Sequence, residues 1–491
     1  MQNAHYYQAL TSHDSRFDGH FFVGVSSTGI YCRPVCRVRT PKQENCIFYK
    51  SAALAEAAGF RPCLKCRPEL SPQTAIRDQH PILSAITQLE DQGEVDVNTL
   101  ALSKHLNISE RHLRRQMSEA FGISPSNFLL TRRLLRCKKL LTETELAIAD
   151  IAYISGFSSL RSFNTHFKNR YHLTPSHLRR QSIKSSAKQA APNRASAPSI
   201  QLMLQYRPPY DWHQLITFIQ QRTIRGVEHV NENTYFRTAN LIIKEKPYCG
   251  WLMVRPHMTK ANTLTIDISE SLSEIIPILL NKLEHQFDLH AEPGLIAQQL
   301  GSLGAGNPGI RLPGSFDGFE MAVRAILGQQ VTVKAAHTLA GRFAKAFGDK
   351  IETPYEDLTT LFPSALITSE LSIDQIASLG IISKRAQTIK AVAQKISQGD
   401  ISLQPTASPE ETIEALQEIT GIGHWTAHYI AMRALHWPDA FPHTDLGIMK
   451  ALNEKHPKTL LAMAETWRPW RSYAVMHLWQ QLSHKRQETP S

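Results

Sequence analysis

The stretch that decides the fold of the C-terminal half is LQEITGIGHWTAHYIAMRALHWPDAFPHTDLGI, residues 416–448. We expect two helices that meet at Gly421-Ile422-Gly423. Because glycine has no side chain, backbone N–H groups at such a turn can approach a phosphate. Gly421 and Gly423 are therefore candidate contacts to a phosphate group. The tripeptide alone is weak evidence, but Asp445 follows Gly423 by 22 residues and adds a candidate catalytic carboxylate.

This combination resembles the helix-hairpin-helix DNA glycosylases, in which a Gly/Pro-rich hairpin is followed by a catalytic Asp that Asp445 matches. Three further segments are RPPYDWHQLITFI (207–219), RLPGSFDGFEMAVRAILGQQVTV (311–333) and WRPWRSYAVMHLW (467–479). With them the resemblance narrows to the bacterial 3-methyladenine DNA glycosylase II (AlkA) family over residues 203–480. It implies an enzyme that hydrolyses the N-glycosidic bond of alkylated bases in double-stranded DNA.

The chemistry agrees with that implication. Base excision leaves an oxocarbenium-like sugar, and a fixed carboxylate can stabilise this cation or orient the attacking water. A base such as 3-methyladenine is cationic, and aromatic faces attract cations. The resemblance implies that four aromatic residues line the base pocket and that two glutamines lie where the family inserts a wedge into the duplex. The pocket residues are Phe218, Trp425, Tyr429 and Trp479, and the glutamines are Gln329 and Gln330.

Two departures from family patterns refine this hypothesis. Related lyases carry a Schiff-base Lys just after the hairpin, where this chain has Trp425, so we expect no strand cleavage. The Tyr-Leu pair that follows the catalytic Asp in the family is replaced by Leu446 and Gly447, so the range of substrates is expected to differ.

Four cysteines near the N-terminus form two close pairs. Cys32 and Cys36 have three residues between them, Cys63 and Cys66 have two, and 26 residues separate the pairs. Such spacing is typical of tetrahedral Zn²⁺ sites. From spacing alone, a closed site that only stabilises a small domain is the better interpretation.

The neighbouring residues change that interpretation. GIYCRPVCRVR (29–39) and AAGFRPCLKCRP (57–68) make residues 10–72 similar to the N-terminal domain of the Ada methylation-response family. The resemblance implies that Cys32 is both a zinc ligand and the acceptor of a methyl group from methylphosphotriesters. Zinc keeps sulfur as the nucleophilic thiolate. We expect Arg33, Arg37 and Arg39 to approach the DNA backbone, and Cys46, Cys137 and Cys249 to be structural.

The net charge of +11 is concentrated in one block. Residues 100–185 hold 15 Lys and Arg against 5 Asp and Glu, whereas residues 1–99 are balanced at 10 and 10. Such a block indicates a surface that binds a polyanion. Helix, polar turn and second helix occur twice, with Gly156 in the second turn, and residues 80–180 resemble the AraC-type DNA-binding domain. The candidate DNA contacts are Arg111, His112, Arg114, Arg115, Ser159, Arg161 and Ser162.

A chain of 491 residues is expected to form several domains. We predict a multidomain fold with a small α/β zinc domain (1–76), an all-α double helix-turn-helix domain (80–182) and a linker (183–200). An α+β N-terminal subdomain (201–290) and an all-α helix-hairpin-helix glycosylase domain (291–491) follow. No signal peptide or membrane-spanning run is evident, so a cytoplasmic monomer is expected. As an activator, it would bind RNA polymerase as well as DNA.

Two alternatives remain open at this stage. The chain could be a transcription factor that keeps an inactive glycosylase fold for DNA binding. It could instead be a regulator that responds to a small molecule, although no separate effector-binding domain is visible. The Pro-Cys-His-Arg motif of O6-alkylguanine methyl transfer does not occur, so repair of that lesion is not predicted.

Overall fold

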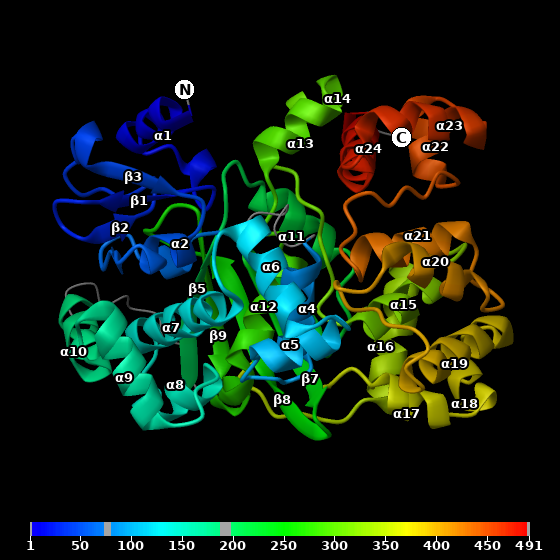
Figure 1. Ribbon diagram of the computed structural model, residues 1–491. Helices are drawn as coiled ribbons and strands as arrows, with labels where there is room; N and C mark the ends of the chain where they lie inside the picture. Colours follow the sequence, from blue (N-terminus) through cyan, green and yellow to red (C-terminus); the bar gives the residue numbers. More distant parts are fainter. Residues whose placement is uncertain (1, 73–79, 187–197, 489–491) are drawn as a thin grey trace. The chain divides into compact units, whose positions relative to one another are not determined.

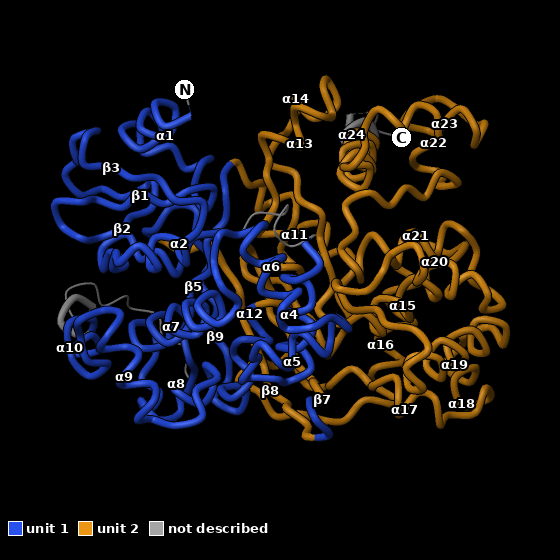
Figure 2. The backbone as a smooth tube through the Cα atoms, in the orientation of Figure 1, with its two compact units in different colours: residues 1–208, 243–245, 259–280 blue, residues 209–242, 246–258, 281–491 orange. Residues whose placement is uncertain are grey.

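The computed structural model describes residues 2–72, 80–186 and 198–488, and they divide into two compact units (Figure 2). Unit 1 comprises residues 1–208, 243–245 and 259–280, and unit 2 comprises residues 209–242, 246–258 and 281–491. Most of the predicted linker, residues 187–197, lies outside the described residues, as does most of the predicted boundary at 76–80. Among the described helices, none is both long enough and apolar enough to span a bilayer.

The first part of unit 1 is a small α/β fold around a four-stranded sheet of order β3-β1-β2-β4. Strand β1 (Phe22–Val25) pairs antiparallel with β2 (Ile30–Cys32) and with β3 (Cys46–Tyr49), whereas β4 (Arg61–Pro62) pairs parallel with β2. Helix α1 (Gln2–Thr11) precedes the sheet, α2 (Ala52–Ala57) connects β3 to β4, and the 3₁₀-helix η3 (Pro68–Leu70) follows β4. The parallel pairing brings the segments of the two cysteine pairs side by side.

Within the described residues 80–186, the chain forms seven helices, and the two predicted helix-turn-helix units are among them (Figure 1). They are α4 (Pro81–Asp91), α5 (Thr99–His105), α6 (Glu110–Phe121), α7 (Pro125–Glu143), α8 (Ile148–Ile154), α9 (Leu160–Tyr171) and α10 (Pro175–Ser186). Ser109 and Ser159 each accept a hydrogen bond from the third residue after them, which is the N-cap geometry that starts α6 and α9. Pro125 and Pro175 both occupy the first turn of their helices, as their equivalent sequence positions predict.

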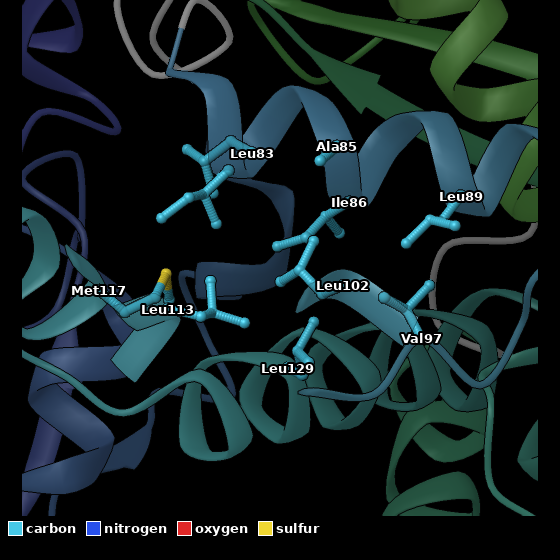
Figure 3. Packing of buried hydrophobic residues seen from close by; sticks show 10 residues of the cluster. Leu83, Ala85, Ile86, Leu89, Val97, Leu102, Leu113, Met117 and Leu129 are labelled. Atoms are coloured by element: carbon cyan, nitrogen blue, oxygen red, sulfur yellow. The ribbon is translucent and has the colours of Figure 1, made fainter. Parts of the chain in front are cut away.

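The first helix-turn-helix unit is held by an apolar core. Leu102 of α5, Leu113 and Met117 of α6 and Ile86 of α4 are almost completely buried. Figure 3 shows these side chains pointing toward one another between the helices. Leu113 and Met117 are four residues apart and therefore share one face of α6, which leaves the opposite, Arg-rich face exposed.

The chain then forms strands that precede the C-terminal helices. Strand β5 (Ser199–Gln205) pairs antiparallel with β9 (Thr263–Ser269) along its whole length, and both belong to unit 1. In unit 2, β6 (Glu228–Asn231) pairs antiparallel with β7 (Thr234–Ile243). The intervening elements are α11 (Trp212–Gln220), β8 (Lys246–Pro256) and α12 (Ile276–Gln286).

Unit 2 continues as an all-α fold around the buried helix α15 (Gly318–Leu327). This helix packs against α16 (Val333–Phe347), α19 (Ser383–Ser397) and α21 (His424–Arg433). A run of apolar residues on nearly all sides is typical of such a central helix. The other helices are α13 (Pro293–Leu300), α14 (Ser302–Ala305), α16 (Val333–Phe347), α17 (Ala365–Glu370), α18 (Ile373–Ala377), α19 (Ser383–Ser397), α20 (Pro409–Gln417), α21 (His424–Arg433), α22 (Leu446–Leu452), α23 (Pro457–Ala464) and α24 (Arg471–Glu488).

The predicted fold class is confirmed: a zinc-type α/β region, a double helix-turn-helix, a strand-containing segment and a helical C-terminal half occur in that order. The strands expected in the α+β segment 201–290 include β7, β8 and β9. The compact units do not follow the predicted boundaries, because β5 and β9 belong to unit 1. Those domain boundaries stay predictions.

Candidate active site, metal centre and DNA-binding helices

Asp445 lies at the N-terminus of α22, where its carboxylate caps the helix. Its Oδ1 accepts a hydrogen bond from the Ile448 N–H at 2.9 Å. The indole Nε1 of Trp425 donates to Oδ2 at 2.8 Å, and that of Trp479 donates to Oδ1 at 3.0 Å. Three N–H donors therefore fix one carboxylate, which is half-buried. About one of its four acceptor positions remains for a sugar or a water.

The four aromatic residues implied by the resemblance lie together around Asp445. Trp425 and Tyr429 of α21 are stacked, with ring centroids 5.0 Å apart and an interplanar angle of 11°. Phe218 of α11 and Trp479 of α24 are also parallel within 11°, with centroids 6.4 Å apart. The Tyr429 and Trp479 rings, 6.2 Å apart, connect the two pairs.

Gly447 explains how Trp479 reaches Asp445. A Cβ atom on Gly447 would lie 2.8 Å from Asp445 Oδ1 and 3.2 Å from two atoms of the Trp479 indole. Because side chains need more room than this, only glycine leaves the indole N–H in hydrogen-bonding distance of the carboxylate. Gly447, which departs from the family pattern, is thus part of the site. Leu446, which also departs from it, is 70% exposed.

Two arginines that the sequence analysis did not predict adjoin this aromatic cluster. The Arg222 guanidinium carbon lies 3.7 Å from the Phe218 centroid, and that of Arg433 lies 4.9 Å from it. Arg433 also donates to the Tyr429 hydroxyl at 2.9 Å. Burial lowers the pKa of both guanidinium groups. Burial by itself would raise the pKa of Tyr429, but the charges of Arg433 and Arg222 outweigh it, so that pKa is lowered.

A sequence signal for these arginines did exist. Arg222 follows Phe218 by four residues, and Arg433 follows Tyr429 by four. On a helix this spacing places both residues on one face, which holds for Tyr429 and Arg433 of α21. Arg222 lies just beyond the end of α11 and reaches back to Phe218 by donating to its backbone carbonyl at 3.0 Å.

Three histidines lie next to Asp445 and Trp425 in the sequence and close to one another in space. The His424 ring centroid lies 4.0 Å from that of His428 and 4.1 Å from that of His443. Burial, reinforced by the neighbouring imidazoles, lowers the pKa of His424 to about 4 and that of His428 to about 3. All three rings are therefore neutral in the folded protein near neutral pH.

The hairpin between α20 and α21 has the predicted geometry. Gly421 has φ +98°, and a Cβ there would lie 2.2 Å from the Thr388 hydroxyl, so this position requires glycine. Gly423 is the N-cap residue of α21 and has extended backbone. Gln329 donates to the Gly421 carbonyl at 2.9 Å, which ties it to the hairpin, whereas Gln330 is exposed with φ +53°. Of the two predicted wedge residues, Gln330 has the more accessible side chain.

The four predicted metal ligands lie together in unit 1. Their sulfur atoms are all within 4.8 Å of one another, and Cys66 is half-buried whereas the other three are buried. Four thiolates at Zn–S distances near 2.3 Å have sulfurs about 3.8 Å apart in a tetrahedron, so the cluster fits the ion. The register of β2 and β4 pairs Tyr31 with Pro62, which places Cys32 beside Cys63.

The structure contradicts the prediction that Arg33 approaches the DNA backbone. It is only 4% exposed, and its guanidinium pairs with Asp18 instead of facing solvent, with Nε 2.9 Å from Oδ1. The Arg33 backbone N–H donates to Cys66 Sγ at 3.4 Å. Arg37 and Arg39 are exposed, as a role at the DNA backbone requires. Of the three remaining cysteines, Cys137 is buried and Cys46 and Cys249 are half-buried, and none of the three forms a disulfide within the residues that the structure describes.

The residues predicted to contact DNA differ in how exposed their side chains are and in the partners that these side chains already have. Arg111, Arg114 and Arg115 are exposed on α6, and the latter two lie 3.6 Å and 4.0 Å from carboxylates one turn away. His112 is half-buried, with Nδ1 3.1 Å from Arg115. On α9, Arg161 is exposed, whereas Ser159 caps the helix by accepting the Ser162 N–H at 3.2 Å.

Models of four protein families match the chain in order. The metal binding domain of Ada matches residues 5–69, a helix-turn-helix domain 102–181, the AlkA N-terminal domain 201–317, and the HhH-GPD superfamily of base excision DNA repair proteins 323–470. These matches confirm the resemblances drawn from the sequence. With the four-cysteine cluster, the first match identifies a Zn²⁺ site.

Two curated relatives extend this finding. The probable bifunctional transcriptional activator/DNA repair enzyme AlkA of Mycobacterium tuberculosis is 32% identical over 501 residues, which cover 99% of this chain and 97% of the relative. DNA-3-methyladenine glycosylase 2 of Escherichia coli is 34% identical over 276 residues, covering 56% of this chain and 95% of its own. Among solved structures, a 3-methyladenine DNA glycosylase from Archaeoglobus fulgidus covers 56% of this chain and 96% of its own, with 18% identity and a TM-score of 0.48.

Proposed function

Because this chain belongs to the family of bifunctional transcriptional activators and DNA repair enzymes that includes the Mycobacterium tuberculosis relative, we propose that it excises alkylated bases from DNA and regulates the response to alkylation damage. The observation that carries the enzymatic part is the geometry of Asp445. Its carboxylate is fixed by Trp425, Trp479 and a backbone N–H within the aromatic cluster.

The base is expected to stack between Phe218 and Trp479. Their rings are parallel within 11° and their centroids lie 6.4 Å apart, which supports an aromatic base packing against both of them. Such a position places the sugar near Asp445, because Trp479 donates to that carboxylate. This arrangement supports the roles that the family resemblance implies for these residues.

The reaction is a hydrolysis. The bond between C1′ and the base nitrogen breaks, and its electron pair leaves with the base. The carboxylate of Asp445 stabilises the electron-poor C1′ or orients the water that adds to it, and that water loses one proton. Trp425 occupies the position where a lyase needs an amine, so the DNA strand stays uncut at this step.

Cys32 is the proposed methyl acceptor in the zinc region. Its sulfur attacks the methyl carbon of a methylphosphotriester, the S–C bond forms, and the C–O bond breaks with its electrons on the phosphate oxygen. Bound Zn²⁺ supplies the chemistry that keeps sulfur as thiolate at neutral pH. Four thiolates with one dication sum to about −2, and methylation reduces this to about −1, so repulsion of DNA phosphates decreases.

The double helix-turn-helix would then read promoter DNA. The exposed Arg111, Arg114, Arg115 and Arg161 are suited to phosphate or base contacts, since positioning contacts predominate at such interfaces. Contact with RNA polymerase, a monomeric state and a cytoplasmic location complete the proposal.

The decisive experiment treats the full chain with methylated duplex DNA and scores two products by mass spectrometry: free alkylpurine and a methyl group on Cys32. Asp445→Asn should lower base release at least about 100-fold while methylation of Cys32 continues. Asp374→Asn, a change at an exposed carboxylate of α18, is the matched control. Equal base release by the Asp445→Asn variant and the unmodified protein would remove Asp445 from the mechanism.

One outcome would favour the main alternative, a regulator with an inactive glycosylase fold. In that case the unmodified protein would release no base from any alkylated duplex, although methylation would still strengthen promoter binding. A methyl group on a different cysteine, or on none, would refute the sensor part.

A further inference from the structure

Arg207 lies two residues beyond the end of strand β5, and it is almost completely buried, at 1% exposure. Its Nε donates to the Asp18 carbonyl at 2.9 Å, and its Nη2 donates to the Pro72 carbonyl at 3.0 Å. Both acceptors belong to the zinc region, which precedes Arg207 by more than 130 residues. A residue beyond the predicted linker is thus built into the N-terminal region within unit 1.

Asp18 connects this contact to the metal centre. Its carboxylate accepts from Arg33 Nε at 2.9 Å and from the Ser71 hydroxyl at 3.3 Å. Arg33 in turn donates its backbone N–H to Cys66 Sγ at 3.4 Å and its Nη1 to the Cys66 carbonyl at 3.0 Å. Consecutive hydrogen bonds therefore lead from Arg207 through Asp18 and Arg33 to the zinc ligand Cys66.

A second, separate connection starts at the residue after Cys66. Arg67 donates through Nη2 to Glu143 of α7 at 2.7 Å and through Nε to Glu69 at 2.9 Å. The other oxygen of Glu143 accepts the backbone N–H of Met203, in strand β5, at 3.1 Å. Both connections end on one segment, residues 203–207.

A guanidinium is costly to bury, and it is tolerated only where hydrogen bonds replace its water. Arg207 meets this condition by donating to two carbonyls in loops of the zinc region. Loss of its donors would leave those buried carbonyls short of partners and would free the loop that carries Asp18. The position of Arg33, and with it the hydrogen bond to Cys66 Sγ, would become less defined.

We propose that Arg207 is a positioning residue for the metal centre: the strand at the start of the glycosylase half holds the Asp18–Arg33–Cys66 contacts in place, so that the four thiolates retain Zn²⁺. Retention of the metal thereby depends on a segment outside the metal-binding domain. Since coupling between two sites is reciprocal, the metal also stabilises strand β5. The proposal requires neither methyl transfer nor base excision.

The first test measures zinc release from the full chain into an excess of a chromophoric chelator. Arg207→Met should release zinc about tenfold faster than the unmodified protein, since one or two hydrogen bonds from a charged donor are lost. Arg207→Lys, which keeps a charge and a donor, should restore part of the difference. Arg16→Met is the matched control, because Arg16 is an exposed arginine of the same region. Equal release rates for Arg207→Met and the control would overturn the proposal.

The second test needs no variant and covers the case in which Arg207→Met fails to fold. Hydrogen exchange of the unmodified chain is compared with and without chelation of zinc. Exchange should increase in residues 199–205 and stay unchanged in residues 383–397 of α19, which belong to unit 2. No change in residues 199–205, or an equal increase in α19, would overturn the coupling.

Discussion

Replacing Arg222 with Met should shift the preference of the glycosylase toward positively charged bases. The Arg222 guanidinium lies 3.7 Å from the Phe218 centroid. A base stacked on Phe218, at about 3.4 Å from the ring, would then lie no more than about 7 Å from this charge. An alkylated purine cation is repelled at that distance, whereas a neutral base is not. Methionine removes the charge and keeps an unbranched side chain in its place.

The magnitude follows from Coulomb's law. Two unit charges about 7 Å apart in a medium of effective dielectric constant near 20 interact by about 2 kcal/mol. Arg222 is half-buried, and screening by the solvent that it contacts weakens the repulsion, so that we expect a value between about 1 and about 2 kcal/mol. The ratio of excision rates for a cationic over a neutral base should therefore rise between about fivefold and thirtyfold.

The assay is single-turnover kinetics on two duplexes that differ only in the target, 7-methylguanine as the cationic base and hypoxanthine as the neutral one. Arg225→Met, at an exposed arginine three residues away, controls for a general loss of positive charge. If Arg222→Met changes both rates by the same factor, its guanidinium does not act on the charge of the base. A fall in the ratio would show that the sign of the reasoning is wrong.

Three further changes test other parts of the structure. Gly447→Ala should lower the rate of base release at least about tenfold, because its Cβ would lie 2.8 Å from Asp445 Oδ1. The zinc content should change little, and single-turnover rates and zinc content are measured on the same preparation. The buried carboxylate of Glu56 accepts four hydrogen bonds from four side chains. Glu56→Ala should therefore lower the free energy of unfolding by about 3 kcal/mol, and Glu56→Gln should lower it by less. Denaturant unfolding curves measure both changes. The pKa values of His424 and His428 are lowered to about 4 and about 3, against about 6.5 in the unfolded chain. The stability that depends on their neutral rings is therefore fully present above pH 6.5, and it is lost as the pH falls from there through about 4 for His424 and about 3 for His428. His428→Gln should flatten the fall in Tm over that window, and an identical profile for both proteins would exclude these rings as its cause.

The two halves of the protein use buried charge in different ways. In unit 1, carboxylates such as Glu56 and Glu69 are surrounded by donors from distant parts of the sequence, and they hold the zinc region against the helix-turn-helix helices. In unit 2, the guanidinium groups of Arg222 and Arg433 adjoin the aromatic cluster. The first arrangement fixes positions, and the second sets the electric field that a base would meet.

The sequence by itself determined those features whose signals are local. Zinc ligands have short characteristic spacings, so Cys32, Cys36, Cys63 and Cys66 could be grouped from their spacing alone, and their sulfurs do lie together. The repeated pattern of helix, polar turn and second helix, with Gly156 in the second turn, predicted both helix-turn-helix units, and a serine caps the second helix of each. The hairpin glycines and Asp445 were found because their spacing follows a family pattern, and the family models confirm that membership.

Only the tertiary structure decided what the charged and small residues do. Arg33 looked like a DNA contact, but Asp18, fifteen residues away, pairs with it in the interior. Gly447 looked like a loss of the family pair, yet it leaves room for the indole of Trp479, which follows it by 32 residues in α24. The physical reason is that local spacing specifies backbone conformation and metal geometry, whereas the partner of a buried charge or the space beside a Cα is set by segments that the sequence places far apart.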